Sequence, residues 1–331
     1  MKLIKEKFTK LDIIEKQIYI KLIKDKFERK LAKELDLTRV SAPLLVTKES
    51  GLQDDLSGVE RKVSFDILKD GKELEIVQSL AKWKRMALKK YSFPTHKGLY
   101  TDMTAIRRDD KIDETHSIYV DQWDWEKVIT KKDRTLSYLK KTVRKIVKAI
   151  AETSEMLKQK GFDSVSISKD VFFITSQELL DMYPFASDKE REYLITKEHK
   201  TVFIMQIGGA LSDGKPHDLR APDYDDWSLD GDLLFYHEVL DMALEISSMG
   251  IRVDKETLLK QIEISGKQER LEYAYHKAII AEELPLTIGG GIGQSRLCML
   301  LLDRAHIGEV QASYWDKETI KTCEEFGIEL L

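Results

Sequence analysis

Residues near the C-terminus combine a flexible backbone with a positive charge. Four glycines occur within the five residues 289–293, and Arg296 opens an apolar run that extends to Leu302. Glycine has no Cβ, so its backbone can approach a ligand closely. The apolar run is typical of a buried helix, in whose first turn an arginine opposes the helix dipole. A residue placed against its local preference suggests a ligand, here a phosphate. A glycine-rich loop that merely precedes a core helix explains the spacing equally well.

Two common nucleotide-binding patterns do not match this stretch. No Gly-Lys-Ser or Gly-Lys-Thr follows the glycines, as a phosphate-binding P-loop requires. The glycines also lack a clear surrounding βαβ unit and an acidic residue that closes a following strand, both of which mark a dinucleotide-binding fold. A nucleotide site here therefore belongs to a different fold.

Further candidate ligands occur upstream, in two short polar stretches. Residues 51–58 form a polar turn that includes Asp54; a surface turn without a ligand is the alternative. The basic helix predicted over residues 79–88 begins at Ser79 and contains Lys84, which lies beside Trp83 soon after a predicted strand end. A solvated basic helix face is the alternative.

The stretch 116–125 is predicted to be a strand with two chemically different faces. Gln122 and Asp124 share one face with Val120, whereas Trp123 and Trp125 share the other. The first face offers an amide and a carboxylate to a ligand. An exposed sheet face is the alternative.

Carboxylates are also concentrated in the second half of the chain. Residues 211–228 contain five aspartates with one histidine, one arginine and two prolines, and the prolines and aromatics favour an ordered loop over a site. A strand is predicted to start at Asp232 and another at Glu245. Carboxylates on neighbouring strands suit Mg²⁺, which prefers oxygen ligands shared with substrate phosphates.

The elements that must position these residues are a mixture of helices and strands. Residues 8–36 show helical spacing through Leu11, Ile14, Ile18, Leu22, Phe27, Leu31 and Leu35. Residues 37–46, with Pro43, are expected to form an edge strand. A hairpin is expected around Asp70-Gly71. Further helices are expected at 133–160, 177–182, from 187, at 254–265 and 268–283, and further strands at 103–107, 171–175 and 201–207, with loops at 93–100 and through the glycines.

Composition and charge set the class of protein. The chain has 331 residues, 34% charged and 42% hydrophobic, with a net charge of −4, which gives no reason to expect a general nucleic-acid surface. No apolar run reaches the roughly 18 residues of a membrane span, and the N-terminus has no apolar signal core. Cys298 and Cys323 form neither a metal pattern nor a disulfide framework. A cytoplasmic protein is expected.

The stretch 289–297 resembles motif 3 of the class II aminoacyl-tRNA synthetases. In that family the glycines form the floor of the adenine pocket and the arginine contacts ATP phosphates. Arg107, before a loop between two strands, resembles the motif 2 arginine that holds the α-phosphate, although Asp109 stands where the family usually has a glutamate. The N-terminal helix followed by the Pro43 strand resembles motif 1, which forms the dimer interface.

A closer resemblance is to the ammonia-dependent asparagine synthetases, or aspartate–ammonia ligases. It rests on the stretches 53–58, 79–85, 119–126, 220–228 and 244–253. It implies an α+β fold in which a mainly antiparallel sheet is flanked by helices, within a single catalytic domain over residues 1–331. The helical segment 1–36 then stands where the aspartyl and asparaginyl tRNA ligases have an oligonucleotide-binding barrel. A homodimer without a tRNA or membrane partner is expected.

The resemblance also implies a reaction and a set of roles. ATP activates the β-carboxylate of aspartate as an adenylate, and ammonia then gives asparagine, with AMP and pyrophosphate released. Asp54, Arg107 and Gln122 are the expected catalytic residues, with Asp54 binding ammonium and accepting its proton. The expected ATP-binding residues are Arg107, Gly291, Gly293 and Arg296, the substrate-binding residues Ser79, Lys84, Asp124, Asp225 and Ser248, and the Mg²⁺ ligands Asp232 and Glu245.

Two alternatives remain open from the sequence. One is a fragment of an aspartyl- or asparaginyl-tRNA ligase, which would need tRNA contacts. The other is a non-catalytic relative of the synthetases, but such proteins tend to lose the phosphate arginines or the metal carboxylates, and this chain has both.

Overall fold

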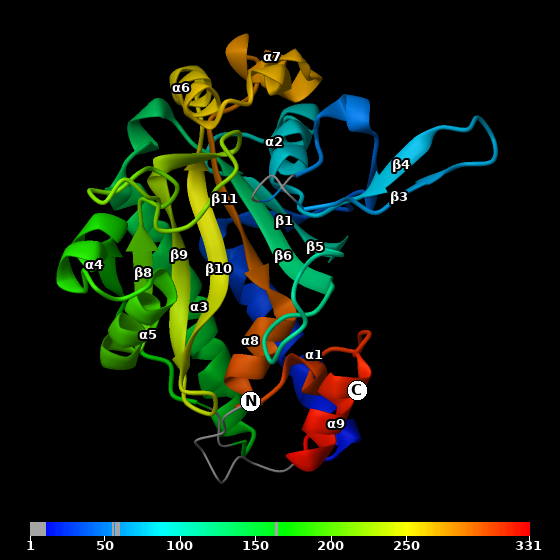
Figure 1. Cartoon of the computed structure of the whole chain (residues 1–331), viewed down its shortest axis with the longest axis vertical. Helices are drawn as coiled ribbons and strands as arrows, with labels where there is room; N and C mark the ends of the chain where they lie inside the picture. Colours follow the sequence, from blue (N-terminus) through cyan, green and yellow to red (C-terminus); the bar gives the residue numbers. More distant parts are fainter. Residues whose placement is uncertain (1–10, 55, 57–59, 163–164) are drawn as a thin grey trace.

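A large, mostly antiparallel sheet forms the centre of the protein (Figure 1). The computed structural model describes residues 11–54, 56, 60–162 and 165–331. Within them the eight strands of this sheet pair antiparallel except at the two edges, where β1 with β5 and β7 with β8 are parallel. Their order is β1 (Leu37–Arg39), β5 (Gly98–Ile106), β6 (Tyr119–Val128), β11 (Thr287–Gly293), β10 (Met242–Arg252), β9 (Asp225–His237), β8 (Thr201–Met205) and β7 (Phe172–Thr175).

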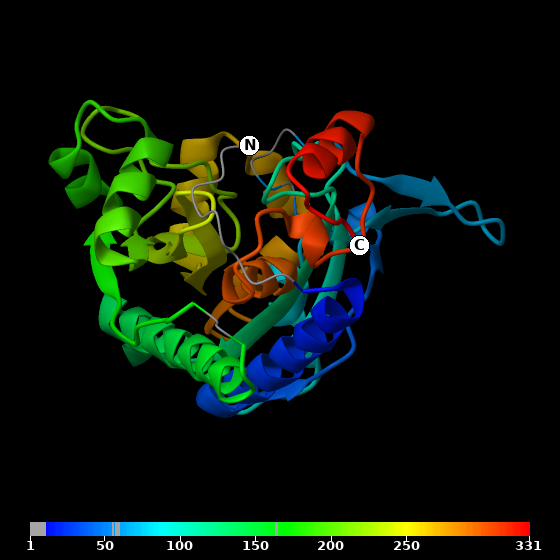
Figure 2. The same ribbon diagram turned by 90° about the horizontal axis from the view of Figure 1, so that it is seen from below.

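Two long helices cover one face of this sheet. Helices α1 (Ile13–Leu35) and α3 (Leu136–Gln159) lie side by side (Figures 1 and 2). Their buried residues join Trp123 and Trp125 of β6 and the apolar residues of α8 (Gln294–Leu301) in the main core. The predicted alternation of β6 is confirmed, because its tryptophans face this core while Gln122 and Asp124 face away from it, into a cavity.

The helix predicted over 8–36 is confirmed from Ile13, residues 8–10 lying outside the described residues, but it buries a different stripe at its N-terminal end. The Asp12 side chain accepts a hydrogen bond from the Glu15 backbone, which satisfies a free N–H of the first turn. Ile20 and Ile23 are buried, whereas Ile14 and Ile18 are 67% and 55% exposed. Isoleucines occur on both sides of the helix, so the spacing could not identify the buried one.

The other face of the sheet carries shorter helices. Helices α4 (Ser176–Met182) and α5 (Asp188–His199) cover the β7–β9 side, and α2 (Ala81–Lys90) contacts β5, β6 and β11. The helix expected from residue 187 is confirmed, and the Ser187 side chain caps it by accepting a hydrogen bond from the Glu190 backbone. Helix α6 (Lys255–Ser265) matches its prediction, but the predicted helix 268–283 divides into a short 3₁₀ turn (Gln268–Glu272) and α7 (Ala274–Ile280). Helix α9 (Lys317–Glu325) lies near the C-terminus.

The region predicted as one edge strand belongs to two separate sheets. Residues 37–39 form β1 of the large sheet, and β2 (Leu45–Val46) joins the hairpin of β3 (Ser64–Asp66) and β4 (Glu73–Ile76). Pro43 lies between β1 and β2 and in neither. The hairpin itself is confirmed, although its strands are shorter than predicted, and it projects from the body of the molecule (Figure 1).

The boundaries of four further strands also differ from the sequence prediction. The glycine stretch is the strand β11, paired with β6 on one side and β10 on the other, because hydrogen bonding on both edges outweighs the low strand preference of glycine. Strand β5 starts at Gly98, within the predicted loop 93–100. Strands β9 and β10 begin at Asp225 and Met242, so Asp232 and Glu245 lie inside strands rather than at their starts.

No helix in the described part of the chain is long and apolar enough to cross a membrane.

Candidate active site

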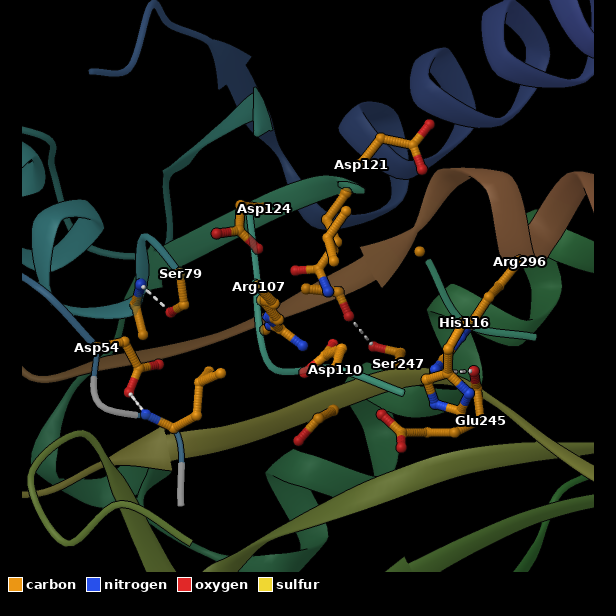
Figure 3. A pocket seen from close by; sticks show the side chains of 18 of the residues that line it. Asp54, Ser79, Arg107, Asp110, His116, Asp121, Asp124, Glu245, Ser247 and Arg296 are labelled. Atoms are coloured by element: carbon orange, nitrogen blue, oxygen red, sulfur yellow. Dashed lines mark hydrogen bonds between the residues drawn. The ribbon is translucent and has the colours of Figure 1, made fainter. Parts of the chain in front are cut away.

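One cavity of ≈560 Å³ collects almost all of the residues singled out from the sequence (Figure 3). It is walled by β6, β10 and β11, by α2, and by the loops before β6 and β9. Of the predicted site residues, those that line it are Asp54, Ser79, Lys84, Arg107, Gln122, Asp124, Asp225, Glu245, Ser248, Gly291, Gly293 and Arg296. Asp232 does not line it but lies next to it, opposite Ser248 across the β9–β10 pair.

The glycines of β11 leave room for the side chains of the neighbouring strand. Gly291 pairs with Asp124 and Gly293 with Gln122. A Cβ on Gly291 would lie 2.7 Å from Asp124 Oδ1 and closer still to Gln122 Oε1. The Gln122 amide and the Asp124 carboxylate thus extend over the bare backbone of Gly291. A side chain at residue 291 would displace both groups.

Lys84 reaches the same place from α2. Its ammonium group donates to the Gly290 carbonyl at 3.0 Å and lies 3.4 Å from Asp124 Oδ2. Burial lowers the pKa of Lys84, and the charge of Asp124 opposes this effect. Ser79, just before α2, accepts a hydrogen bond from the Ala81 backbone at 3.1 Å. This part of the cavity therefore offers a cation, a carboxylate, an amide and a hydroxyl, the groups that an amino acid needs.

Two arginines line a different part of the cavity, and both are held by backbone carbonyls. Arg107 Nε donates to the Gln78 carbonyl at 3.2 Å, and Arg296 Nη1 donates to the Glu245 carbonyl at 3.0 Å. Because carbonyls do not neutralise a guanidinium, both charges remain available to an anion. Burial raises the pKa of the nearby Asp110, against the charges of Arg107 and Arg296. Figure 3 shows Asp54 and Ser79 at one end of this site and Arg296 at the other, with Arg107 between them.

Asp109 is not part of this arrangement of charges. It forms an exposed ion pair with Arg61, whose Nε donates to Asp109 Oδ1 at 3.0 Å. Hydrogen bonds from the Arg61 side chain and backbone lower the pKa of Asp109 to about 2. Asp109, which stands where motif 2 usually has a glutamate, is thus paired with Arg61 at the surface.

A bulge in β10 brings Glu245 and Ser248 to the same face. Glu245 and Ser247 pair with the consecutive residues Leu234 and Leu233 of β9, so β10 carries one extra residue at this point. Without it, two residues three positions apart would point to opposite faces. The bulge also exposes Ser247 to the cavity, where its hydroxyl donates to the Gly291 carbonyl at 2.8 Å.

Asp232 and Glu245 form a pair of carboxylates at the edge of the cavity. One Asp232 oxygen accepts a hydrogen bond from Arg220, and the other, Oδ1, is buried without a hydrogen-bond partner. Burial and the charge of Glu245 raise the pKa of Asp232 to about 6, although Arg220 opposes them. Burial acts on Glu245 in the same direction, but the charges of Arg296 and Arg220 hold its pKa below the usual value.

This pair suits Mg²⁺ as a partial ligand set. Among the described residues no cluster of three or more His, Cys, Asp or Glu side chains is arranged to hold a metal by itself. Mg²⁺ is usually bound through one or two carboxylates together with substrate phosphates and water. The unpartnered oxygen of Asp232 and its repulsion from Glu245 are consistent with a cation that arrives with a phosphate ligand.

Asp54 presents an unused carboxylate oxygen at the other end of the cavity. Its Oδ1 accepts a hydrogen bond from the Leu56 backbone at 2.9 Å, whereas Oδ2 is buried and has no hydrogen-bond partner. A buried carboxylate oxygen without a partner is costly, so this position favours a small donor ligand.

Asp225 has a structural partner that the sequence did not reveal. It is the first residue of β9, and its predicted place in a loop over the site is wrong. Its carboxylate pairs with Arg252, which also contacts Glu126 at 3.0 Å. Burial raises the pKa of Asp225, opposed by Arg252. This buried network lies on the cavity face of the sheet, over Gly289, where a Cβ would meet both Glu126 and Arg252.

Known proteins resemble this chain over nearly its whole length. A family model described as aspartate-ammonia ligase matches residues 14–327. The chain belongs to this family. An aspartate–ammonia ligase of Clostridium tetani is 58% identical over 329 residues, which cover 99% of this chain and 96% of that protein. One from Ruminiclostridium cellulolyticum is 54% identical and covers 97% and 96% of the two chains.

Solved structures with the same fold are class II tRNA synthetases. Entamoeba histolytica asparaginyl-tRNA synthetase in complex with asparaginyl-adenylate has a TM-score of 0.62 at 15% identity, over 89% of this chain and 66% of the synthetase chain. The Pyrococcus horikoshii asparaginyl-tRNA synthetase complexed with asparaginyl-adenylate has a TM-score of 0.61 at 16% identity, over 89% and 68%. The ligase family thus shares its fold with longer synthetases, of which this chain spans about two thirds.

The ligase site also contains residues that the sequence reasoning missed. Arg220, Asp110, His116 and Ser247 line the cavity but were not predicted. Arg220 is the only arginine of the acidic stretch 211–228, and a guanidinium among aspartates was a usable signal. Asp110 and His116 lie in the loop after Arg107, so the motif 2 resemblance also pointed to them.

We expect Gly291→Ala to impair the ligase site, because the new methyl group displaces Gln122 and Asp124. Overpacking of this kind costs about 1–3 kcal/mol, measurable as a lower free energy of unfolding in urea together with weaker aspartate binding. Gly209→Ala is the matched control, since a Cβ there meets nothing within 4 Å. Equal behaviour of the two variants would contradict the role assigned to the glycine strand.

Proposed function

We propose that this protein makes L-asparagine from L-aspartate, ammonia and ATP through a β-aspartyl-adenylate, releasing AMP and pyrophosphate. The observation that carries the proposal is a single cavity in which Arg107 and Arg296, both held by backbone carbonyls, accompany the amino-acid ligands Lys84, Gln122 and Asp124. Membership in the aspartate–ammonia ligase family supports the same reaction.

The first step is adenylation of aspartate. Lys84 binds a carboxylate of the substrate, while Ser79, Gln122 and Asp124 bind its α-amino group. Arg107 holds the α-phosphate of ATP as the β-carboxylate attacks it, and Arg296 offsets the charge of the departing pyrophosphate. Fixed donors that need no rearrangement stabilise developing charge most effectively, and both arginines are already held by backbone carbonyls.

Asp232 and Glu245 are the residues proposed to hold Mg²⁺. The ion would neutralise phosphate charge and orient the triphosphate. Arg220 already contacts Asp232, so this guanidinium and the bound cation share one carboxylate.

The second step is the attack of ammonia on the acyl carbon. Only free ammonia is a nucleophile, so a bound ammonium ion must first lose a proton. The unpartnered Oδ2 of Asp54 is the proposed acceptor. AMP then leaves as the amide forms.

Ammonia rather than glutamine is the proposed nitrogen donor. Release of ammonia from glutamine in asparagine-forming amidotransferases uses a reactive cysteine. Burial raises the pKa of Cys298 to about 12 and that of Cys323 to about 11, so neither is a thiolate near neutral pH. Both are free thiols, which suits the reducing cytoplasm proposed as the site of the reaction.

The test of the proposed function is an assay for asparagine with aspartate, ATP, Mg²⁺ and ammonium. Asparagine and AMP should form without tRNA, and adding tRNA should change nothing. Glutamine should not replace ammonium at a comparable rate. A requirement for tRNA, or glutamine-driven synthesis at the ammonium rate, would overturn the proposal.

Arg107→Ala should reduce turnover by about 10²–10³-fold, the usual cost of removing one well-placed charge-stabilising donor. Arg107→Lys should restore little, because a point charge cannot reproduce the two-pronged contact of a guanidinium. Arg61→Ala is the control, since Arg61 pairs with Asp109 at the surface. Near-normal turnover of Arg107→Lys would contradict the proposed phosphate contact.

A homodimer through α1 is also proposed. Ile13, Ile14 and Ile18 form an exposed apolar group on the outer side of this helix, as a buried subunit interface would require. Ile14→Asp should shift the protein toward monomer in sedimentation experiments, whereas Phe185→Asp, at an exposed residue far from α1 in sequence, should not. If the wild-type protein is a monomer at micromolar concentration, the proposed dimer is refuted, but the proposed reaction is not.

A further inference from the structure

A fully buried carboxylate lies just outside the cavity, at Asp223 in the loop before β9. One of its oxygens, Oδ2, is 2.8 Å from Lys82 Nζ, 2.9 Å from Arg270 Nη1 and 2.9 Å from His276 Nε2. These partners come from α2, from the 3₁₀ turn after α6 and from α7. Burial raises the pKa of Asp223, but the charge of Lys82 and its other partners outweigh this and hold it far below the usual value. None of the four side chains lines the cavity.

Lys82 connects this cluster to the segment that carries Asp54. In addition to its ion pair, the Lys82 ammonium group donates to the Gln53 carbonyl at 3.1 Å. The Gln53 side-chain oxygen accepts from the backbone N–H groups of Asp54, at 3.2 Å, and Gln78, at 2.9 Å. Gln78 in turn donates through its side chain to the Asp54 carbonyl at 2.8 Å. The backbone is therefore held on both sides of the Asp54 side chain, by Lys82 at the Gln53 carbonyl and by Gln78 at the Asp54 carbonyl, while the Gln53 side chain also donates to the Ile76 carbonyl at 2.9 Å.

The hydrogen bonds through Gln53 and Gln78 also reach Arg107, the proposed α-phosphate ligand, but less directly. Arg107 donates to the carbonyl of Gln78, so Gln78 contacts both Asp54 and Arg107. Arg107 also belongs to the long strand-to-loop segment after β5, which has support of its own through the bond from the Arg107 backbone to the Ile118 carbonyl at 2.9 Å. Loss of Lys82 should consequently disturb Asp54 more than Arg107.

We propose that Lys82 and Asp223 are positioning residues for the ammonia step, which hold the Asp54 carboxylate in the cavity through the backbone of Gln53. The inference rests on the proposed function, because it assigns the effect to the ammonia-binding role of Asp54. Lys82 touches no substrate in this account and acts only through Gln53. Asp223 fixes the position of the Lys82 ammonium group. Without this ion pair, the flexible four-carbon side chain of lysine could place the ammonium group elsewhere.

The charge balance makes the proposal testable with one substitution. Lys82→Met removes the ammonium group but leaves Asp223 paired with the cationic Arg270 and in contact with His276 Nε2, so the buried carboxylate keeps a cationic partner. A purely structural lysine would lower stability and all kinetic steps together. A positioning lysine should instead affect the step that uses Asp54.

The experiment separates the two chemical steps. Adenylation is measured without ammonium, as aspartate-dependent exchange of labelled pyrophosphate into ATP, and the complete reaction is measured as asparagine formation over a range of ammonium concentrations. Lys82→Met should raise the KM for ammonium about tenfold, the scale expected for losing a charge-assisted hydrogen bond, while the exchange rate and the KM for aspartate stay close to wild type.

Lys16→Met is the matched control. Lys16 is also a buried lysine that donates to a backbone carbonyl, at 3.0 Å to Glu329, and pairs with a carboxylate, that of Glu329, but it lies on α1. This variant should lose stability in urea without any selective change in the KM for ammonium. If Lys82→Met does not fold, as judged by circular dichroism, Asp223→Asn makes the same test by releasing the Lys82 ammonium group, with the same selective rise expected.

The outcomes separate this inference from the proposed function. An unchanged KM for ammonium in a folded variant, or a parallel loss of exchange and synthesis, overturns the positioning role. Wild-type protein that forms no asparagine from ammonium refutes the proposed function, and an active wild type with unaffected variants refutes only the role of Lys82 and Asp223.

Discussion

The absence of side chains along β11 is the constraint on which the site depends. This strand runs through the middle of the sheet, between β6 and β10, where large residues would normally fill both faces. Glycines at 289, 291 and 293 instead leave space on the cavity face of the sheet, into which Gln122, Asp124 and Lys84 extend. The stability cost of glycine in a strand is offset by pairing on both edges and by the core of Trp123, Ile288 and Ile292 on the opposite face.

Some of the buried charged groups around this space are paired with one another, and others lack a full partner within the protein. Arg252, Asp225 and Glu126 neutralise one another over Gly289, and Asp223 neutralises the cluster beside α2. At the cavity or directly beside it, the groups without a full partner include Asp54 Oδ2, Asp232 Oδ1 and the two arginines held by carbonyls. Because a buried polar group without a partner is destabilising, these positions are the ones where substrates, rather than the protein, are expected to complete the pairing.

Local patterns in the sequence predicted much of this arrangement, and long-range pairing accounts for what they missed. The two faces of β6 were predicted correctly, because alternation within a strand depends only on neighbouring residues. The sequence did not predict that the glycines form a strand, because their pairing with β6 and β10 involves residues far away in the chain. The bulge that aligns Glu245 with Ser248 depends on the register with β9, which no periodicity in β10 reveals. The partnership of Asp225 with Arg252 was hidden for the same reason.

The central chemical proposal is that the β-carboxylate of aspartate attacks the α-phosphate of ATP, which Arg107 holds. Aspartate labelled with ¹⁸O in its β-carboxylate tests this claim directly when it is turned over with ATP, Mg²⁺ and ammonium. An adenylate intermediate predicts that one labelled oxygen appears in the phosphate of AMP, since the bond between the acyl carbon and that oxygen breaks when ammonia attacks. Label in inorganic phosphate, with ADP as the co-product, would instead show an acyl-phosphate and contradict the account.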